Sequence, residues 1–409
     1  MGQVPRSIQV VGAGLAAATA IETLRTEGYD GEITLVGAEP HLPYERPPLS
    51  KDYLAGGAER DSVFVHTRDW FDENGVRLHL GIRAVAIDPG AGSTRLEDGS
   101  SVAWDALLLA TGSRPRRAGL PGEDLDGVLH LRDLDDSDRL RDALSGAERL
   151  AVIGGGWIGL EVAAAARGAD VDVTVLERGE LPLLGVLGPE VAGVFAELHR
   201  DHHVDLRCGV EVSRLVGEGG HVAGVELADG QSIPADLILV AVGAEPNTGL
   251  ASEAGLQVAD GVVVDSALRA SVPGVWAAGD IAEAFHPVLG AHLRVEHWDN
   301  AREQGRAAAR SMLGQPMSYD RLPYFYTDQY ELGMEYTGFL GPRDYDHVVL
   351  RGDVPGLEFV AIWCSEDRVI AGMGVNVWDA MDSVRDLVTS GREVSLERLR
   401  DPDVALADL

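Results

Sequence analysis

The 409-residue sequence predicts an α/β protein in which one fold unit is inserted into another copy of itself, followed by an α+β domain. Residues 8–14 (IQVVGAG) and 150–156 (LAVIGGG) each run from an apolar strand into glycines, and an Ala-rich helical stretch follows each. Each helix leads into a second apolar strand that closes on an acid, Glu39 or Glu177. From about residue 321, aromatic and polar residues alternate, which is typical of an antiparallel sheet.

The first glycine turn reads Gly12-Ala13-Gly14-Leu15-Ala16-Ala17. Gly12 allows the tight turn, Gly14 lets the backbone approach a pyrophosphate, and Ala17 still permits close packing of helix against strand. The N-terminus of the helix then presents free N–H groups to phosphates. Glu39, about 20 residues further on, is placed to bind an adenosine ribose. This combination predicts a Rossmann-like dinucleotide-binding domain.

The second turn has all three spaced glycines, Gly154, Gly156 and Gly159. Its acid, Glu177, is expected to bind the 2′-hydroxyl of NADH and to repel the 2′-phosphate of NADPH. Arg178 follows at once and weakens that preference. The sequence therefore favours NADH and leaves NADPH as the weaker alternative.

Later segments indicate that the first unit is interrupted and then resumes. Residues 106–112 and 237–243 are buried strands that end in glycine turns, and residues 262–280 give two short strands that end at Gly279-Asp280. Two dinucleotide sites are useful together as a flavin and a nicotinamide, with Asp280 accepting a ribityl hydroxyl. We predict an FAD-binding domain at 1–113 and 245–320, an NADH-binding domain at 114–244, and a C-terminal domain at 321–409.

Composition excludes other classes of protein. The hydrophobic share of 45% and the charged share of 24% are those of a globular protein, and the net charge of −32 argues against nucleic-acid or anionic-membrane binding. No stretch approaches ~18 uninterrupted apolar residues, and no signal-peptide pattern is present, so we expect a cytoplasmic protein. Cys208 and Cys364 form no C-x-x-C pair. We interpret each as a buried apolar side chain and expect no metal site.

Among the 34 lysine and arginine residues only Lys51 is a lysine, at the end of the run PYERPPLSK. Codon bias explains why lysine is rare but not why this one lies here. Two prolines fix the local backbone, and Ser50 is a candidate helix N-cap. The run contains no cysteine, which argues against a disulfide reductase.

The run PYERPPLSK, together with GGGWIGLE, VGAEPN, GVWAAGD, VEHWDNA and PYFYTDQYELGMEYTG, resembles a known family. This family is the FAD-dependent NAD(P)H:ferredoxin reductases of oxygenase and cytochrome P450 systems, such as the putidaredoxin, rubredoxin and biphenyl-dioxygenase ferredoxin reductases, and it is related to apoptosis-inducing factor. The resemblance covers essentially the whole chain. It implies a glutathione-reductase-like fold of two nested Rossmann-like domains plus a C-terminal reductase domain.

The resemblance implies that Lys51 lies over the flavin near N5, paired with Glu161, and stabilises the negative charge that hydride brings. Alternatively, Glu161 is an acid stabilised by the helix dipole. Tyr326 stands where several members have tryptophan beside the flavin, or it is a core aromatic residue of the sheet. The candidate catalytic residues are Lys51 and Glu161. The candidate cofactor contacts are Gly12, Gly14, Leu15, Ala16, Glu39, Arg46, Lys51, Ala84, Thr111, Gly112, Arg132, Gly154, Gly156, Ile158, Gly159, Glu177, Gly243, Gly279, Asp280, Glu296, Trp298 and Tyr326.

The resemblance also implies an enzyme that takes hydride from NADH onto FAD and passes single electrons to an acidic ferredoxin serving a P450 or Rieske oxygenase. The iron–sulfur cluster belongs to that partner, because this chain lacks the cysteines. Two alternatives stay open: reduction of rubredoxin, a quinone or monodehydroascorbate, and redox sensing in the manner of apoptosis-inducing factor. The protein is expected to be a monomer or a dimer.

An acidic ferredoxin requires a local basic patch on so acidic a protein. Three arginines recur every four residues and share one helix face, and three more cluster after the ATG turn. Each cluster is alternatively an ordinary solvated surface. The two candidate docking clusters are Arg302, Arg306 and Arg310, and Arg114, Arg116 and Arg117.

Overall fold

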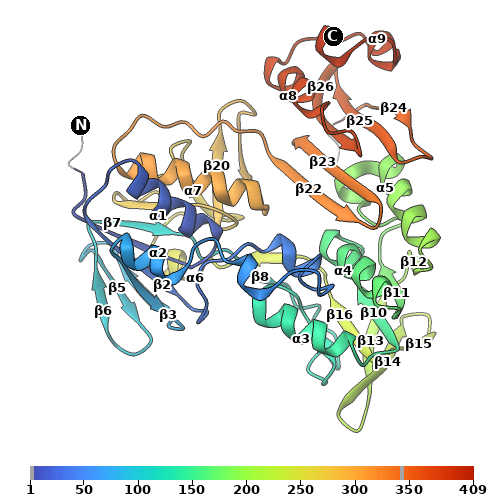
Figure 1. Cartoon of the computed structure of the whole chain (residues 1–409), viewed down its shortest axis with the longest axis horizontal. Coiled ribbons are helices and arrows are strands. Elements are labelled where there is room, and N and C mark those ends of the chain that lie inside the picture. Colours follow the sequence, from blue (N-terminus) through green and yellow to red (C-terminus); the bar gives the residue numbers. More distant parts are fainter. Residues whose placement is uncertain (1–3, 341–344) are drawn as a thin grey trace. The chain divides into compact units, whose positions relative to one another are not determined.

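The computed structural model describes residues 4–340 and 345–409, and its contacts divide the chain into two compact units (Figure 1). Unit 1 contains the chain up to Glu45, Arg60–Arg114 and Glu245–Pro323. Unit 2 contains Arg46–Glu59, Pro115–Ala244 and Tyr324–Leu409. The two units do not correspond one to one to the three predicted domains, which stay a prediction. Unit 2 combines the segment predicted to bind NADH with residues 46–59 and with the C-terminal segment.

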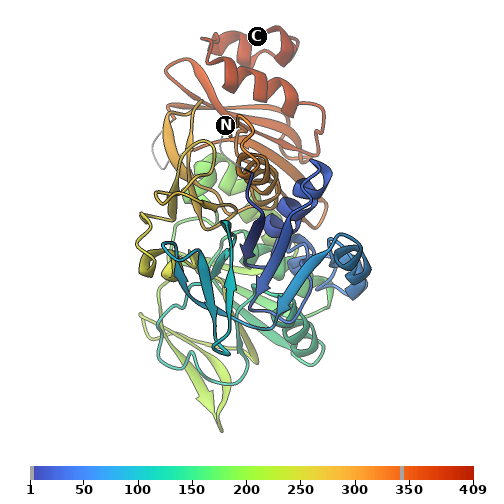
Figure 2. The same ribbon diagram turned by 90° about the vertical axis from the view of Figure 1, so that its left-hand side faces the viewer.

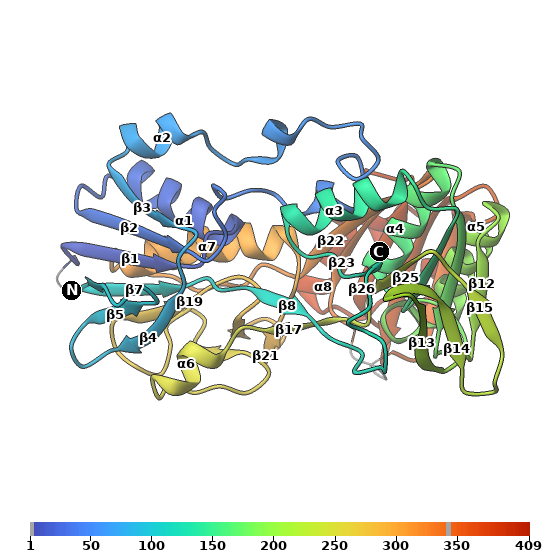
Figure 3. The ribbon, with the colours of Figure 1, turned by 90° about the horizontal axis from the view of Figure 1, so that it is seen from below.

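Unit 1 is built on a parallel sheet whose strands lie in the order β19-β7-β1-β2-β3 (Figure 3). Its central strand β1 (Ser7–Val11) pairs with parallel strands on both sides, and all its residues after Ser7 are buried. The other strands are β2 (Glu32–Gly37), β3 (Val76–Leu80), β7 (Ala106–Leu109) and β19 (Val275–Ala277).

Helices α1 (Leu15–Thr26) and α7 (Trp298–Met312) of unit 1 lie side by side (Figures 1 and 3). They approach closely because small residues meet: a Cβ at Gly305 would lie 2.4 Å from the Ala16 carbonyl oxygen. Two smaller sheets and short helices complete the unit. They are β4 (Ala84–Asp88), β5 (Ser93–Leu96), β6 (Ser101–Ala103), β18 (Val262–Val264), β20 (Ala282–His286), β21 (Ala291–Arg294), α2 (Arg68–Glu73), α6 (Gly249–Glu253) and η2 (Arg60–Val63).

Unit 2 repeats the same plan with the parallel order β12-β11-β10-β16-β9. The strands are β9 (Val128–Leu129), β10 (Arg149–Ile153), β11 (Asp172–Glu177), β12 (Asp205–Cys208) and β16 (Leu237–Val240). Its helices are α3 (Leu134–Leu144), α4 (Trp157–Gly168), α5 (Leu184–Asp201) and the short η1 (Pro47–Ser50). A small antiparallel sheet contains β13 (Val212–Glu218), β14 (His221–Leu227) and β15 (Ser232–Pro234). Strands β8 (Ser113–Pro115) and β17 (Ala244–Pro246) pair where the chain passes between the units.

The C-terminal part of unit 2 is the antiparallel sheet that the alternating pattern predicted, in the order β22-β23-β26-β25-β24. Its strands are β22 (Tyr324–Gln329), β23 (Leu332–Gly338), β24 (His347–Asp353), β25 (Glu358–Ser365) and β26 (Arg368–Val375). Helix α8 (Met381–Ser390) packs on β23 and β26, as the red helices of Figure 2 show, and α9 (Leu396–Arg400) and η3 (Leu406–Asp408) follow. The inner face of the sheet shares one hydrophobic core with α5, where the indole of Trp363 donates to the Leu187 carbonyl at 3.2 Å.

Candidate functional site

The first glycine turn follows β1 in unit 1. Gly12 has φ +106°, and a Cβ there would lie 2.1 Å from the Ala110 carbonyl oxygen, so no other residue fits this backbone. Gly14 is the N-cap of α1, and a Cβ there would meet no atom within 4 Å. The first turn of α1 also contains no acidic residue. The positive end of the helix therefore faces open space of the kind that a phosphate group fills.

The second turn, in unit 2, has the same geometry. Gly154 has φ +107°, and its Cβ would lie 2.4 Å from the Ala241 carbonyl oxygen. Gly156 is the N-cap of α4 with no atom near its Cβ position, and α4 has no acid in its first turn. A Cβ at Gly159 would lie 2.2 Å from the Gly154 oxygen, which explains the third glycine. Each unit therefore contains a glycine turn and an open helix N-terminus, here called a phosphate cradle because this backbone arrangement suits a phosphate.

The two acids lie at the ends of the second strands: Glu39 follows β2 by two residues, and Glu177 is the last residue of β11. Glu39 accepts a hydrogen bond from the Tyr44 hydroxyl at 2.5 Å. Glu177 accepts from the backbone N–H groups of Gly155 at 2.7 Å and Gly179 at 2.5 Å, so its carboxylate is fixed at the second turn. The Arg178 side chain is exposed and pairs with no residue that the structure describes.

Other candidates in unit 1 gather beside the first turn. Gly279 has φ +79°, and a Cβ there would lie 3.3 Å from the Cβ of Ala16, so the Gly279-Asp280 step lies against the start of α1. Ser113 donates to the Asp280 carboxylate at 2.9 Å. Thr111 donates to the Asn247 carbonyl at 3.1 Å, and Glu296 pairs with Arg294. The Trp298 ring centre lies 4.2 Å from the Arg302 guanidinium. The remaining unit 1 candidates are Leu15 in α1, Ala84 in β4 and Gly112 at φ +62°.

Lys51 and Glu161 form the ion pair that the resemblance implies, within unit 2. The Nζ–Oε1 distance is 2.8 Å, and the side chains are 15% and 5% exposed. Thr327 donates to the same carboxylate oxygen at 2.5 Å, and Ser50 donates to the other. The prediction that Ser50 is a helix N-cap was wrong. Ser50 is the last residue of η1, and its hydroxyl donates to the buried carboxylate instead. Losing one member of such a buried pair typically costs about 3–5 kcal/mol.

The strand β22 adds aromatic and acidic groups around Lys51. The Lys51 ammonium lies 5.7 Å from the centre of the Tyr326 ring. Burial raises the pKa of the neighbouring Asp328, and Lys51 partly offsets this shift. Sequence reasoning missed Thr327 and Asp328, although the matched run PYFYTDQYELGMEYTG contained both.

The other unit 2 candidates lie at loops and turns. The Arg46 guanidinium donates to the Arg132 carbonyl, and the Arg132 N–H donates to Asp136 at 2.9 Å. Gly243 has φ +105°, and its carbonyl accepts from the Arg116 N–H at 2.9 Å. Ile158, at the start of α4, is 43% exposed and leaves an apolar surface beside the second phosphate cradle.

Most arginines of the two candidate docking clusters have acidic neighbours. On α7, Arg306 pairs with Glu303 at 2.6 Å, Arg310 pairs with Glu27 at 2.8 Å, and Arg302 pairs with Asp299 and Glu303. In the other cluster, Arg114 pairs with Glu245 at 2.9 Å and Arg117 with Asp124 at 2.6 Å. These acids reduce the local positive charge of both clusters.

Neither cysteine is a candidate site residue, although Cys208 in β12 pairs in register with Glu177. Cys364 is buried as predicted, and burial raises the pKa of its thiol to about 11. Cys208 is only half-buried, contrary to prediction, because β12 is an edge strand; burial still raises the pKa of its thiol. High thiol pKa values make both poor nucleophiles. Within residues 4–340 and 345–409, no cluster of His, Cys, Asp or Glu suits a metal ion, and no helix has the length and hydropathy of a membrane span.

Comparison with known proteins covers nearly the whole chain. Residues 6–305 match the pyridine nucleotide-disulphide oxidoreductase family, and residues 324–409 match the reductase C-terminal family. The chain is 38% identical to the ferredoxin–NAD(+) reductase component of the biphenyl dioxygenase system of Paraburkholderia xenovorans, over 98% of each chain. It is 35% identical to putidaredoxin reductase of Pseudomonas putida, over 98% of this chain and 96% of the relative. Among solved structures, the covalent putidaredoxin reductase–putidaredoxin complex matches with a TM-score of 0.94 at 35% identity, over 98% and 97% of the two chains.

Proposed function

The chain belongs to the pyridine nucleotide-disulphide oxidoreductase family, as a ferredoxin reductase with a reductase C-terminal domain, and we propose that it transfers electrons from NADH to a ferredoxin-type iron–sulfur protein. The acceptor then serves a P450 or Rieske oxygenase. The family implies FAD and a nicotinamide nucleotide. When bound, FAD would supply the chemistry that links two-electron transfer from the nicotinamide to one-electron transfer to the acceptor. The proposal places the enzyme in the cytoplasm.

The observation that carries this proposal is the pair of phosphate cradles. In unit 1, Gly12, Gly14 and the adjoining Gly279-Asp280 step suit the pyrophosphate and ribityl groups of FAD, with Glu39 for the adenosine ribose. In unit 2, Gly154 and Gly156 suit the pyrophosphate of NADH. Neither cradle has an acid in the following helix turn that would repel a phosphate.

The residues proposed for catalysis are Lys51 and Glu161. The Glu161 side chain is 5% exposed and lies 2.8 Å from the lysine Nζ, so this ion pair holds the ammonium in one position. A fixed positive charge of this kind stabilises an electron-rich ring without taking part in proton transfer. We propose that this ammonium faces the flavin near N5, with Tyr326 beside it.

Nucleotide preference is proposed to depend on Glu177. The variant Glu177→Gln keeps an acceptor for the Gly155 or Gly179 N–H but removes the charge that repels a 2′-phosphate. We expect kcat/KM for NADH to fall about tenfold, since a hydrogen bond to a charged group contributes about 1.5–3 kcal/mol, and the ratio of NADPH to NADH activity to rise. Steady-state assays with both nucleotides measure this. Unchanged flavin absorbance and Tm provide the control, and an unchanged ratio contradicts the assignment.

Ferredoxin docking is proposed to use the arginine face of α7. Replacing Arg306 and Arg310 with Glu should raise the KM for an acidic ferredoxin several-fold, because the new carboxylates join Glu303 and Glu27 in a negative cluster. NADH-to-dye activity should not change, and the difference should shrink as salt rises. Arg385→Glu, on α8 and in a similar ion pair with Asp382 at 2.7 Å, is the matched control. An equal KM before and after the α7 substitutions contradicts docking there.

The acceptor is tested by steady-state assays of the FAD-loaded enzyme with a [2Fe–2S] ferredoxin, rubredoxin, a quinone and monodehydroascorbate. Ferredoxin should give the highest kcat/KM. A preference for any of the other three contradicts the proposal. So does an NADH-reduced enzyme that persists for minutes in the presence of every carrier, which is the behaviour of a sensor.

A further inference from the structure

A chain of hydrogen bonds runs from Glu161 to helix α5, entirely within unit 2. Thr327 Oγ1 lies 2.5 Å from Glu161 Oε1, and Gln329 Nε2 lies 3.3 Å from Thr327 Oγ1. His199 Nε2 lies 2.9 Å from Gln329 Oε1, and the Tyr330 hydroxyl lies 3.5 Å from His199 Nδ1. Thr327 and Gln329 are alternate residues of β22, so both point to the same face of the strand.

The donors of this chain all point in one direction. An ionised Glu161 only accepts, so the Thr327 hydroxyl donates to it and accepts from the Gln329 amide. The Gln329 oxygen then accepts from His199, which must carry its proton on Nε2 and offer Nδ1 to Tyr330. Burial lowers the pKa of His199 to about 4, so at neutral pH the ring has one donor and one acceptor, as this order requires.

The hydrogen-bonded side chains from Glu161 to His199 are shielded from water. Glu161 is 5% exposed, Thr327 and Gln329 are each 1% exposed, and His199 is fully buried. In such surroundings a lost link cannot be replaced by solvent, and a fully satisfied polar network holds its members rigidly.

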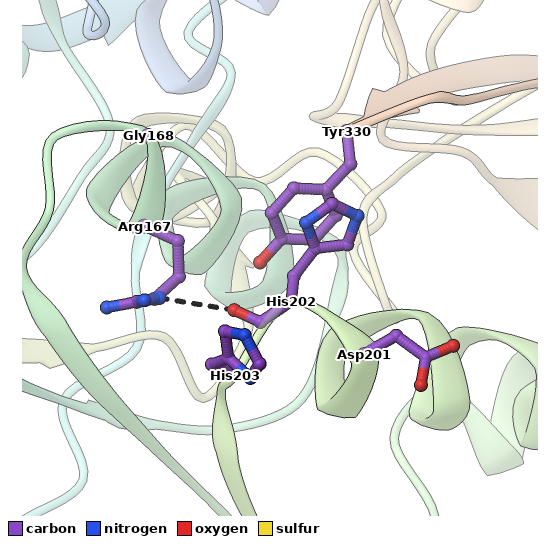
Figure 4. Close-up of a pocket in the computed structure, with 6 residues that line it drawn as sticks. All are labelled: Arg167, Gly168, Asp201, His202, His203 and Tyr330. Carbon is purple, nitrogen blue, oxygen red and sulfur yellow. Dashed lines mark hydrogen bonds between the residues drawn. The ribbon is translucent and has the colours of Figure 1, made fainter.

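Tyr330, at the end of this hydrogen-bond chain farthest from Glu161, lines a surface pocket of about 250 Å³. The Tyr330 ring stacks on His202 at 3.7 Å, as Figure 4 shows, and His202 pairs with Glu331 at 2.8 Å. Tyr330 has φ +55°, a left-handed conformation that this residue type rarely adopts, so its placement is tightly constrained. The pocket residues are Arg167, Gly168, Asp201, His202, His203 and Tyr330.

We propose that Thr327, Gln329 and His199 are positioning residues that fix the carboxylate of Glu161 and, through it, the direction of the Lys51 ammonium. Lys51 shares Oε1 of Glu161 with the Thr327 hydroxyl, so rotation of the carboxylate moves the lysine. Without Thr327, the remaining partners of the carboxylate among residues 4–340 and 345–409 are Ser50 and Lys51. The consequence for flavin reduction rests on the proposed function, whereas the hold on Lys51 does not.

The single lysine provides a direct readout. Lysine labelled with ¹³C at Cε gives one side-chain signal in the FAD-loaded protein, because Lys51 is the only lysine. We expect this signal to shift in Thr327→Val, Gln329→Leu and His199→Phe. It should return close to its original position in Thr327→Ser and in His199→Gln, which keep a hydroxyl and a neutral donor. The rate of flavin reduction by NADH should fall about three- to tenfold in the first three variants and recover in the last two.

Thr337→Val is the matched control. Thr337 lies in the adjacent strand β23, is fully buried, and its hydroxyl has no hydrogen-bond partner in the described part of the chain. This variant should change neither the lysine signal nor the rate. An unmoved lysine signal in Thr327→Val, Gln329→Leu and His199→Phe, or an unchanged rate despite a moved signal, overturns the inference. Failure of the proposed function gives a different result: the chain variants still move the lysine signal, but the reduced wild-type enzyme does not reduce ferredoxin.

Discussion

Replacing Lys51 with methionine should slow the reduction of bound FAD by NADH by a factor of about 10² to 10³, the range found when one fixed electrostatic donor is removed from an active site. The Lys51 side chain is 15% exposed, and its ammonium pairs with Glu161 at 2.8 Å, so the charge is held in one direction and is poorly screened by water. Methionine retains the length of the side chain but not the charge. Anaerobic stopped-flow absorbance of the flavin measures the rate.

Two further variants separate charge from packing. Lys51→Met leaves the Glu161 carboxylate buried without a cation, so it also lowers the free energy of unfolding by about 3–5 kcal/mol. Lys51→Met/Glu161→Gln removes that lone charge, and we expect its stability to recover while flavin reduction stays slow. Lys51→Arg keeps a positive charge but spreads it over a planar fork, so the rate should still fall. An unchanged rate in Lys51→Arg would contradict a specific role for lysine at this position.

The second large effect is expected when valine replaces the second glycine of either turn. Gly14 has φ −97°, which valine adopts without strain, and a Cβ there meets no atom within 4 Å. Gly14→Val should therefore fold but lose FAD, because its side chain occupies the space proposed for the pyrophosphate. Absorbance near 450 nm and thermal unfolding measure the two properties separately.

Gly156→Val is the matched control, because Gly156 caps α4 with φ −83° and similarly open surroundings. This variant should retain FAD but lose reduction by NADH. Gly12→Ala should instead destabilise the fold, because a Cβ would lie 2.1 Å from a backbone oxygen at φ +106°. Retention of FAD by Gly14→Val, or its loss from Gly156→Val, contradicts the assignment of the two cradles.

Local sequence predicted the parts of the fold that depend on backbone conformation. Only glycine suits positions such as Gly12 and Gly154, so a strand that ends in these residues and leads into a helix is recognisable without a structure. The alternating C-terminal residues likewise predicted an antiparallel sheet. These features depend on neighbours within a few residues.

The surroundings of Lys51 could not be predicted from the residues alone. Ser50 looks like a helix cap, and only the packing of η1 against α4 brings its hydroxyl to Glu161. Thr327 and Gln329 come from β22, and His199 comes from α5. The bonded residues His199 and Gln329 are 130 positions apart in the sequence. Whether such polar residues are buried together depends on tertiary packing, which no local pattern encodes. Arg310 similarly finds its partner in Glu27, far away in sequence.

Electron transfer from NADH through this protein to a ferredoxin is tested most directly by an anaerobic reaction with limiting NADH. The FAD-loaded enzyme is mixed with NADH and an excess of a [2Fe–2S] ferredoxin, and ferredoxin reduction is followed by absorbance. Two ferredoxins should be reduced for each NADH consumed, since NADH supplies two electrons and the ferredoxin accepts them singly. Oxidised ferredoxin that persists while the same enzyme reduces a dye with NADH would contradict the account.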